Sequence, residues 1–310
     1  MKIYFAPIQG HTDAAYRHFH AEIFPGKDIV YTTPFIRLER GEIRKKDLKD
    51  AFNTLNDNIQ VVPQVIFRNG EELETLVKLL KQEGAKRIDI NMGCPFPLQV
   101  SKGRGAATIA NPECGAAVKK VVANNPDITF SVKMRLGKDG EEWESLIDTL
   151  NNLNLDHIAV HPRTSKDQYT PDTINMDAFR RLYAKSKNPI VYNGDILIPE
   201  DAVKIMHEFP ELHGIMIGRG ALGRPSILKE IEDKEEWDEE RRLTSTLSFH
   251  KRLLDYYREN LIGGDHQVLS KILPFWEYSE QQTGRKAWKA IKKASTMAKY
   301  QTALTLIKKK

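Results

Sequence analysis

Short apolar runs alternate along most of this chain with stretches of helical periodicity. Runs rich in Ile, Val, Phe and Tyr occur at KIYFA from Lys2, DIVYTT from Asp28, VVPQVIF from Val61, RIDINM from Arg87, TFSVKM from Thr129, HIAVH from His157, PIVYN from Pro189 and GIMIG from Gly214. Strands that are apolar at nearly every position are buried on both faces, as in parallel sheets covered by helices. About eight such units in roughly 230 residues predict an α/β fold, a closed (β/α)8 TIM barrel.

The pattern changes after Pro225, where helical periodicity continues without strand signals. One helical face is predicted to carry Leu247, His250, Leu254 and Tyr257, a second face Leu269, Ile272, Leu273 and Trp276, and a third helix Trp288, Ile291 and Ala298. The acidic stretch Glu230–Glu240 is expected to be a linker or the start of a helix. We therefore predict a barrel in residues 1–235 and a C-terminal all-α bundle of three or four helices in residues 236–310. Residues 40–58 show no regular pattern.

Charge is unevenly distributed along the 310 residues. The net charge is +5, but residues 241–310 contain 15 Lys and Arg against 5 Asp and Glu, a balance of +10 that leaves −5 for residues 1–240. A basic module attached to an acidic body suggests contact with a polyanion. A set of solvated, lysine-rich helices explains the charge equally well.

Cysteine content and hydropathy exclude several classes of protein. Cys94 and Cys114 are the two cysteines, too few for a disulfide framework, and a reducing cytoplasm is expected. They also form no zinc-binding pattern with histidine, so we expect no metal site. The N-terminal segment is interpreted as a strand rather than a signal peptide, and no window approaches the roughly 20 apolar residues of a membrane span.

Polar and small residues gather where the predicted strands end. These positions are Ala6, Pro7 and Ile8 in the first run, Gln64 in the third, Asn91 and Cys94 in the fourth, Lys133 and Arg135 in the fifth, His161 in the sixth, Asn193, Gly194 and Asp195 in the seventh, and Gly218 and Arg219 in the eighth. In a parallel barrel the carboxyl ends of the strands meet at one face, where chemistry takes place. Packing alone explains any one of these residues, but not their joint placement.

The glycine-rich segment GIMIGRGALGRP predicts a phosphate site after the last strand. It matches neither the dinucleotide-binding pattern nor a P-loop. A phosphate, a lysine and amides at a barrel mouth suit flavin mononucleotide (FMN), with Lys133 as the cation beside the reduced ring. A Schiff-base role for Lys133 is the competing interpretation. Cys94 lies in a loop and is a candidate acid, nucleophile or bystander, whereas Cys114 follows a helix-start signal and is expected to pack.

Six segments resemble the tRNA-dihydrouridine synthases in order and spacing. They are APIQGHTD from Ala6, DINMGCP from Asp89, SVKMRLG from Ser131, AVHPRT from Ala159, YNGDI from Tyr192 and MIGRGALGRP from Met216. The sequence departs from the family pattern at Ile8-Gln9, at Pro162 and in the loop after Pro95. These departures affect the shape of loops, and therefore substrate choice, more than the catalytic set.

The resemblance implies a role for each candidate residue. FMN would be bound by Ala6, Pro7, Ile8, Gln64, Lys133, His161, Asn193, Gly194, Asp195, Gly218 and Arg219, the last two at its phosphate. Cys94 would be the general acid, and Asn91 and Arg135 would hold the target uracil. The implied reaction reduces the C5–C6 bond of a D-loop uridine in tRNA, with NADPH or NADH as reductant. Flavin N5 would deliver hydride to C6 and Cys94 a proton to C5.

Two alternatives to this function are open at the level of sequence. An FMN barrel that reduces a small molecule, as dihydroorotate dehydrogenases do, would not need the basic helical tail. A non-catalytic tRNA-binding protein would not need Cys94, Lys133 and His161 together. The resemblance further implies that the helical tail binds tRNA, and we expect a monomer because no surplus apolar helix stands out.

Overall fold

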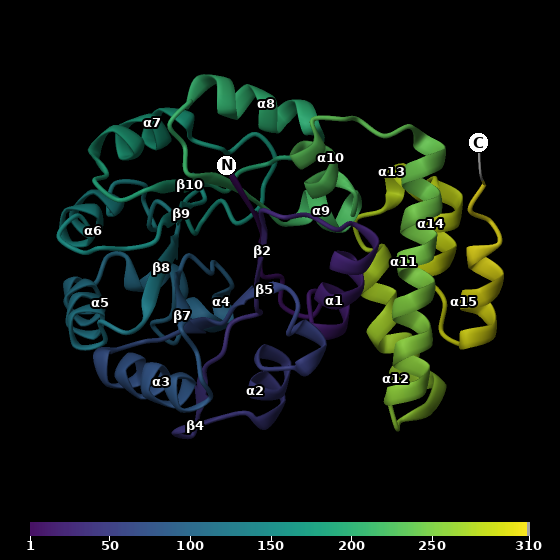
Figure 1. Ribbon diagram of the computed structural model, residues 1–310, viewed down its shortest axis with the longest axis horizontal. Helices are drawn as coiled ribbons and strands as arrows, with labels where there is room; N and C mark the ends of the chain where they lie inside the picture. The colour runs from purple at the N-terminus through teal and green to yellow at the C-terminus, as the bar shows by residue number, and fades with distance from the viewer. Residues whose placement is uncertain (309–310) are drawn as a thin grey trace.

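The apolar runs form one parallel sheet in the computed structural model, which describes residues 1–308 (Figure 1). Its strands are β1 (Lys2–Phe5), β2 (Ile29–Thr32), β5 (Gln60–Val62), β6 (Gln64–Ile66), β7 (Arg87–Met92), β8 (Thr129–Met134), β9 (Ile158–Val160), β10 (Ile190–Tyr192) and β11 (Gly214–Ile217). Neighbouring strands follow the order β5-β2-β1-β11-β10-β9-β8-β7-β6. The first strand therefore pairs with the last, with Lys2 opposite Gly214 and Phe5 opposite Ile217.

Pro63 divides one position of the barrel into two short strands. On its N-terminal side β5 pairs with β2, and on its C-terminal side β6 pairs with β7. Proline has no N–H to donate to a ladder, so the strand is interrupted there, while the Pro63 carbonyl still accepts from the Asp89 N–H at 2.9 Å. Because β5 and β6 are consecutive halves of one strand, the sheet closes into the predicted eight-position barrel.

Amphipathic helices cover the outside of the barrel. They are α1 (Ala14–Ile23), α3 (Gly70–Gln82), α5 (Pro112–Asn124), α6 (Trp143–Leu150), α7 (Met176–Lys185) and α8 (Pro199–Glu208), followed after β11 by α9 (Arg219–Gly223) and α10 (Ile227–Asp233). In α3 the apolar face consists of Leu73, Leu76, Val77 and Leu80, which are all buried. A separate apolar cluster that includes Tyr4, Val191 and Met216 comes from the strands and the residue directly after β1, and it fills the barrel interior.

The region without a clear sequence pattern contains a short hairpin and a helix. Strands β3 (Leu38–Glu39) and β4 (Glu42–Ile43) are antiparallel, and α2 (Lys45–Ala51) and the 3-10 helix η1 (Thr54–Asn56) follow. Arg40 and Gly41 link the two strands with φ angles of 54° and 86°. Two consecutive residues with positive φ are typical of a tight hairpin turn, and glycine adopts such angles freely. Two further short helices, α4 (Pro97–Val100) and η2 (Gly105–Thr108), lie in the loop after β7.

The C-terminal part of the chain is entirely helical within the described residues. Its elements are α11 (Glu239–Asn260), α12 (Gly264–Ile272), η3 (Leu273–Trp276), α13 (Glu280–Thr283), α14 (Arg285–Lys292) and α15 (Met297–Leu304). The helical character is as predicted, but the placement of Ala298 in one helix with Trp288 and Ile291 is wrong. The Thr296 side chain caps a new helix by accepting from the Lys299 N–H, so Ala298 belongs to α15.

The helical part packs directly on the barrel, and α11 lies alongside α1 (Figure 1). Phe249 of α11 contacts Tyr16 and Phe24 edge-on. At the start of α1, the Asp13 carboxylate accepts from the Tyr257 hydroxyl at 2.9 Å and pairs with Lys271 at 2.8 Å. The predicted division of function between residues 1–235 and 236–310 stays a prediction. Between residues 1 and 308, no helix is both long and apolar enough to pass through a bilayer.

Candidate active site

One cavity opens at the carboxyl ends of the barrel strands, and all fourteen residues singled out from the sequence line it. They are Ala6, Pro7, Ile8, Gln64, Asn91, Cys94, Lys133, Arg135, His161, Asn193, Gly194, Asp195, Gly218 and Arg219. The wall also includes His11, Tyr169, Glu277 and Tyr278, which the sequence reasoning missed. Glu277 and Tyr278 follow η3, so the helical part contributes to the same cavity. The structure thus brings the candidates together, and their individual roles stay predictions.

A chain of hydrogen bonds fixes the amide side chains on the cavity floor. The Asp89 carboxylate accepts from the Ser131 hydroxyl at 2.6 Å and from the Gln64 amide nitrogen at 2.7 Å. The Gln64 carbonyl oxygen then accepts from the Asn91 amide nitrogen at 2.8 Å. Because a carboxylate only accepts, the orientation of both amides follows from Asp89. Asp89 was missed in the sequence, although it lies two residues before Asn91 on the same strand face.

Asn91 in turn shapes the loop that carries Cys94. Its side-chain oxygen accepts from the backbone N–H groups of Gly93 and Cys94, both at 3.0 Å. One amide hydrogen of Asn91 goes to Gln64, which leaves the other free to face a ligand. The network therefore runs from Asp89 to the backbone of Cys94 without a gap.

Cys94 is a buried thiol held in place by a glycine contact. Burial raises the pKa of the thiol, although the cations Arg135 and Lys133 lie near enough to lower it. Gly105 has φ +59°, and a Cβ there would lie 2.6 Å from the Cys94 carbonyl oxygen. No other residue fits that backbone approach without displacement. Cys94 is thus a protonated thiol at neutral pH, set at the cavity wall.

Lys133 carries an ammonium group with no hydrogen bond or ion pair to the chain within residues 1–308. Burial, followed by the charge of Arg135, lowers the pKa of Lys133 to about 8, while Asp89 and Cys94 oppose this effect. An enclosed cation without a partner is costly unless a ligand supplies one. This arrangement favours an anionic or electron-rich group in the cavity beside Lys133.

His161 is a neutral imidazole in a defined tautomer. Its Nδ1 donates to the backbone carbonyl of Asn193, and its Nε2 accepts from the Arg163 guanidinium at 3.3 Å. The pKa of His161 lies well below its ordinary value, first because of burial and then because of Arg135 and Lys133. The Asn193 amide nitrogen donates to the Met216 carbonyl at 2.7 Å, which links the seventh and eighth barrel positions.

Asp195 is the centre of an ion-pair network at the cavity rim. Its carboxylate pairs with Arg163 at 2.5 Å and with Arg219 at 2.6 Å. Arg163 is fully buried; it stands at a strand end in the sequence but was given no role there, because nothing in HPRT distinguishes it from an exposed loop arginine. The Tyr169 ring contacts two guanidinium groups, with Arg135 at 4.9 Å and Arg219 at 4.6 Å from its centroid. Arg219, the predicted phosphate ligand, is therefore already oriented by Asp195 and Tyr169.

Cys114 lies apart from this cavity. It is buried in α5, as expected, and its thiol lies 3.7 Å from the Arg68 carbonyl oxygen. Burial raises the pKa of Cys114 to about 11. Of the two cysteines, Cys94 alone faces the candidate site.

Comparison with known families identifies the chain. The family model described as dihydrouridine synthase matches residues 4–309. The chain belongs to the dihydrouridine synthase family. The resemblance found in the sequence is thereby confirmed, and with it the class of enzyme, an oxidoreductase.

Curated relatives and a solved structure agree with this membership. This dihydrouridine synthase is 30% identical to a tRNA-dihydrouridine(16) synthase of Haemophilus ducreyi, over 74% of this chain and 73% of the relative. It is also 30% identical to a probable tRNA-dihydrouridine synthase of Aquifex aeolicus, over 76% of this chain and 74% of the relative. It is 25% identical to tRNA-dihydrouridine synthase B of Escherichia coli (73% and 70%). Morphinone reductase in complex with tetrahydroNAD matches at a TM-score of 0.51 and 9% identity over 76% of this chain and 88% of that one, and supports the barrel fold.

Proposed function

We propose that this dihydrouridine synthase reduces the C5–C6 double bond of a D-loop uridine in tRNA, with FMN as cofactor and NADPH or NADH as reductant. We also propose that it works as a monomer in the cytoplasm. Its relatives carry names that specify tRNA as substrate. The observation that carries the proposal is the convergence in one cavity of a protonated thiol, an unpaired ammonium and oriented amides.

The donor set of the cavity fits FMN. Lys133, as an enclosed cation without a protein partner, would face the electron-rich edge of the flavin ring. Gln64 and Asn193 present amides whose orientation the surrounding hydrogen bonds fix. Gly218 and Arg219 begin α9 directly after the eighth barrel position, where barrels commonly bind phosphate. When bound, FMN supplies the hydride that the nicotinamide donor has given to it.

The residues around the uracil site supply the proton and hold the ring. Cys94 keeps its proton at neutral pH because burial raises the thiol pKa, and it would donate that proton to C5. The free amide hydrogen of Asn91 and the Arg135 guanidinium would donate to the uracil carbonyls, where negative charge builds during reduction. Arg135 is fixed for this by the Thr164 carbonyl at 3.0 Å and by the Tyr169 ring.

The target base must leave the tRNA fold to reach this cavity. The protein must therefore bind the RNA backbone while the base is turned out. The exposed side of α14 and the residue after it carry Lys286, Lys289, Lys292 and Lys293, and none of these forms a salt bridge within the described residues. We call this set the α14 basic face. The Trp288 indole N–H donates to the carbonyls of Trp276 and Glu277 at 2.9 and 3.2 Å, which fixes α14 against the cavity wall. Exposed lysines without salt bridges are suited to phosphate contacts.

The proposed activity is tested by incubating the purified protein with FMN, NADPH and an unmodified tRNA transcript. Nucleoside mass analysis should show uridine converted to a product heavier by two hydrogen atoms, at one position. A protein that binds tRNA but forms no such product is a binding protein. A protein that oxidises NADPH with a small enone but not with tRNA is a small-molecule reductase.

The tRNA contact is tested with charge reversals on the α14 basic face. Lys289→Glu with Lys293→Glu should raise KM for tRNA and make the salt dependence of binding shallower by about 1–2 units of the log–log slope. Lys78→Glu with Lys119→Glu, two exposed lysines without salt bridges on α3 and α5, is the matched control and should change neither value. Equal effects of both pairs would show that general charge, not the α14 basic face, binds the RNA.

A further inference from the structure

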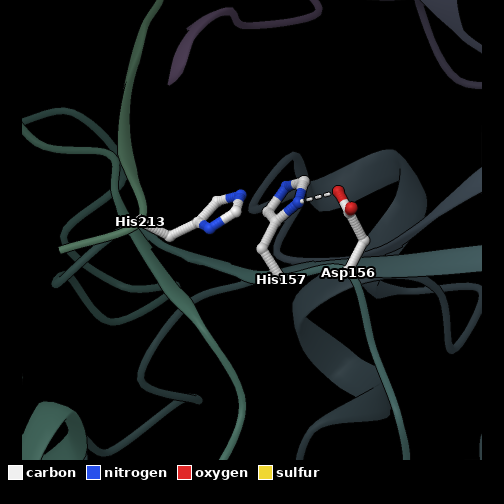
Figure 2. Close-up of side chains that lie close together, drawn as sticks. All are labelled: Asp156, His157 and His213. Atoms are coloured by element: carbon white, nitrogen blue, oxygen red, sulfur yellow. Dashed lines mark hydrogen bonds and ion pairs between the residues drawn. The ribbon is translucent and has the colours of Figure 1, made fainter. Parts of the chain in front are cut away.

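Asp156, His157 and His213 lie close together (Figure 2). Asp156 and His157 precede β9, and His213 precedes β11, so all three lie at the amino ends of strands. One potential ligand atom of each lies within 4.8 Å of the other two. The cluster is not apparent in the sequence, because His213 lies far along the chain from the adjacent pair Asp156 and His157 and the set includes no cysteine.

Two ring nitrogens in the cluster are enclosed and have no hydrogen-bond partner in the part of the chain that the structure describes. They are Nε2 of His157, a residue only 3% exposed, and Nε2 of His213. A buried polar atom without a partner is destabilising, and such atoms in native proteins commonly face an ion or a water. Figure 2 shows nitrogens of the two rings facing one another across a gap.

The carboxylate of Asp156 fixes the tautomer of His157. Its Oδ2 accepts from the Nδ1 of His157 at 2.9 Å, so the proton is on Nδ1 and the lone pair of Nε2 points away from Asp156. A histidine that binds a metal through one nitrogen characteristically donates its other N–H to a carboxylate. Asp156 and His157 therefore have the arrangement of a metal ligand and its orienting partner.

The separation of the two rings suits a shared ion. Their centroids are 5.9 Å apart, and their planes differ by 13°. Two imidazoles bound to one zinc ion at about 2.0–2.1 Å from each nitrogen place their ring centres roughly 5–6 Å apart. No hydrogen bond joins the two rings, and the Nε2 atom of each is left without a partner in the described residues.

Local charge decides which cation fits. Asp156 also pairs with Arg87 at 3.0 Å, so its negative charge is already compensated. Hard cations such as Mg²⁺ and Ca²⁺ need several charged or neutral oxygen ligands and would find too few here. Imidazole nitrogen is a preferred ligand of zinc and of other transition-metal ions such as copper and nickel.

We propose that His157 and His213 bind one Zn²⁺ ion through their Nε2 atoms, with Asp156 as the positioning residue for His157 and water in the remaining coordination positions. The ion joins the starts of β9 and β11. It lies next to Tyr4 of β1, whose ring centroid is 4.5 Å from that of His157. The ion stabilises the amino-terminal end of the barrel and takes no part in uridine reduction.

The test is metal binding by the full-length chain without a polyhistidine tag. A tag must be absent because the Lys2 N–H bonds to the His213 carbonyl, so an N-terminal tag would begin beside the site. After treatment with a chelator, calorimetric titration with Zn²⁺ should show one site, and the thermal unfolding temperature should rise with added Zn²⁺. Co²⁺ in the same position should give visible absorption bands with imidazole character.

The decisive variant is His213→Ala, with His207→Ala, an exposed histidine of α8, as the control. Removal of a direct ligand should weaken Zn²⁺ binding by more than the 10–100-fold typical of a lost orienting partner. The control should bind as the wild type does. If His213→Ala fails to fold, His213→Asn retains a polar side chain and replaces it. Absence of stoichiometric binding to the wild type, or equal binding by wild type and variant, would overturn the proposal and leave water between the rings.

Discussion

Replacement of Cys94 by alanine separates the proton donor from the rest of the site. The thiol is 7% exposed, and its loop is held by Asn91 and by the close approach of Gly105. Removal of the sulfur leaves the backbone hydrogen bonds of that loop intact. We therefore expect the Cys94→Ala enzyme to bind FMN and to accept hydride from NADPH at the wild-type rate.

The expected effect on uridine reduction is large. Because the site is enclosed, water replaces the thiol poorly, and the loss of a general acid slows such steps by about 10²–10⁴-fold. Cys94→Ser should be nearly as slow, since a hydroxyl is a much weaker acid. Burial raises the thiol pKa above its ordinary value of about 8.5. The wild-type rate should therefore be flat through neutral pH and fall only in the alkaline range, where the thiol loses its proton.

The assay is anaerobic stopped-flow absorbance of the reduced enzyme mixed with unmodified tRNA. Flavin reoxidation reports the step that needs the proton, whereas prior reduction by NADPH does not. Cys114→Ala is the matched control because Cys114 is buried in α5 away from the cavity, and it should react as the wild type does. Reoxidation of Cys94→Ala at the wild-type rate would refute the role of Cys94 as the acid.

Three other substitutions test the site and the buried core. Arg219→Ala should weaken FMN binding by about 1.5–3 kcal/mol, roughly 10–150-fold, through loss of a charged phosphate contact; flavin fluorescence titration measures this, and unchanged affinity would remove Arg219 from the phosphate site. Gly105→Ala should lower the unfolding temperature and the turnover number together, because its Cβ would collide with the Cys94 carbonyl; thermal unfolding beside the tRNA assay checks both. Burial lowers the pKa of His20 to about 4, so the unfolded state binds more protons between pH 6.5 and 4. The wild type should lose about 2 kcal/mol of unfolding free energy between pH 7 and pH 5 through this group, and urea unfolding of His20→Gln should show a smaller loss.

The barrel was predictable because its strands are apolar at nearly every position and its helices are amphipathic. The same reasoning located the fourteen cavity residues, since strand ends in a parallel barrel converge. The division of a strand at Pro63 was not predicted, because the apolar run continues on both sides of the proline. The same reasoning also placed Ala298 in the wrong helix, since a threonine cap four residues downstream of a helix end is a weak signal beside continuous helical periodicity.

The missed site residues show what a sequence alone does not contain. Asp89 could have been found from its alternation with Asn91 on one strand face. Arg163 could not, because its burial depends on Asp195, a partner from the next barrel position. Tyr169 and Glu277 come from a loop and from the helical part, and only the three-dimensional packing places them at the cavity.

The pairing of β1 with β11 has a consequence for how the chain is made. Residues 2–5 leave the ribosome well before their partner strand, which comprises residues 214–217. At about 5–20 residues per second, roughly 10–40 seconds pass before that partner exists. One edge of β1 stays unpaired throughout, and an unpaired apolar edge is a template for association with other chains. Closure of the barrel is therefore a late event with high contact order, and slow folding is expected of this enzyme.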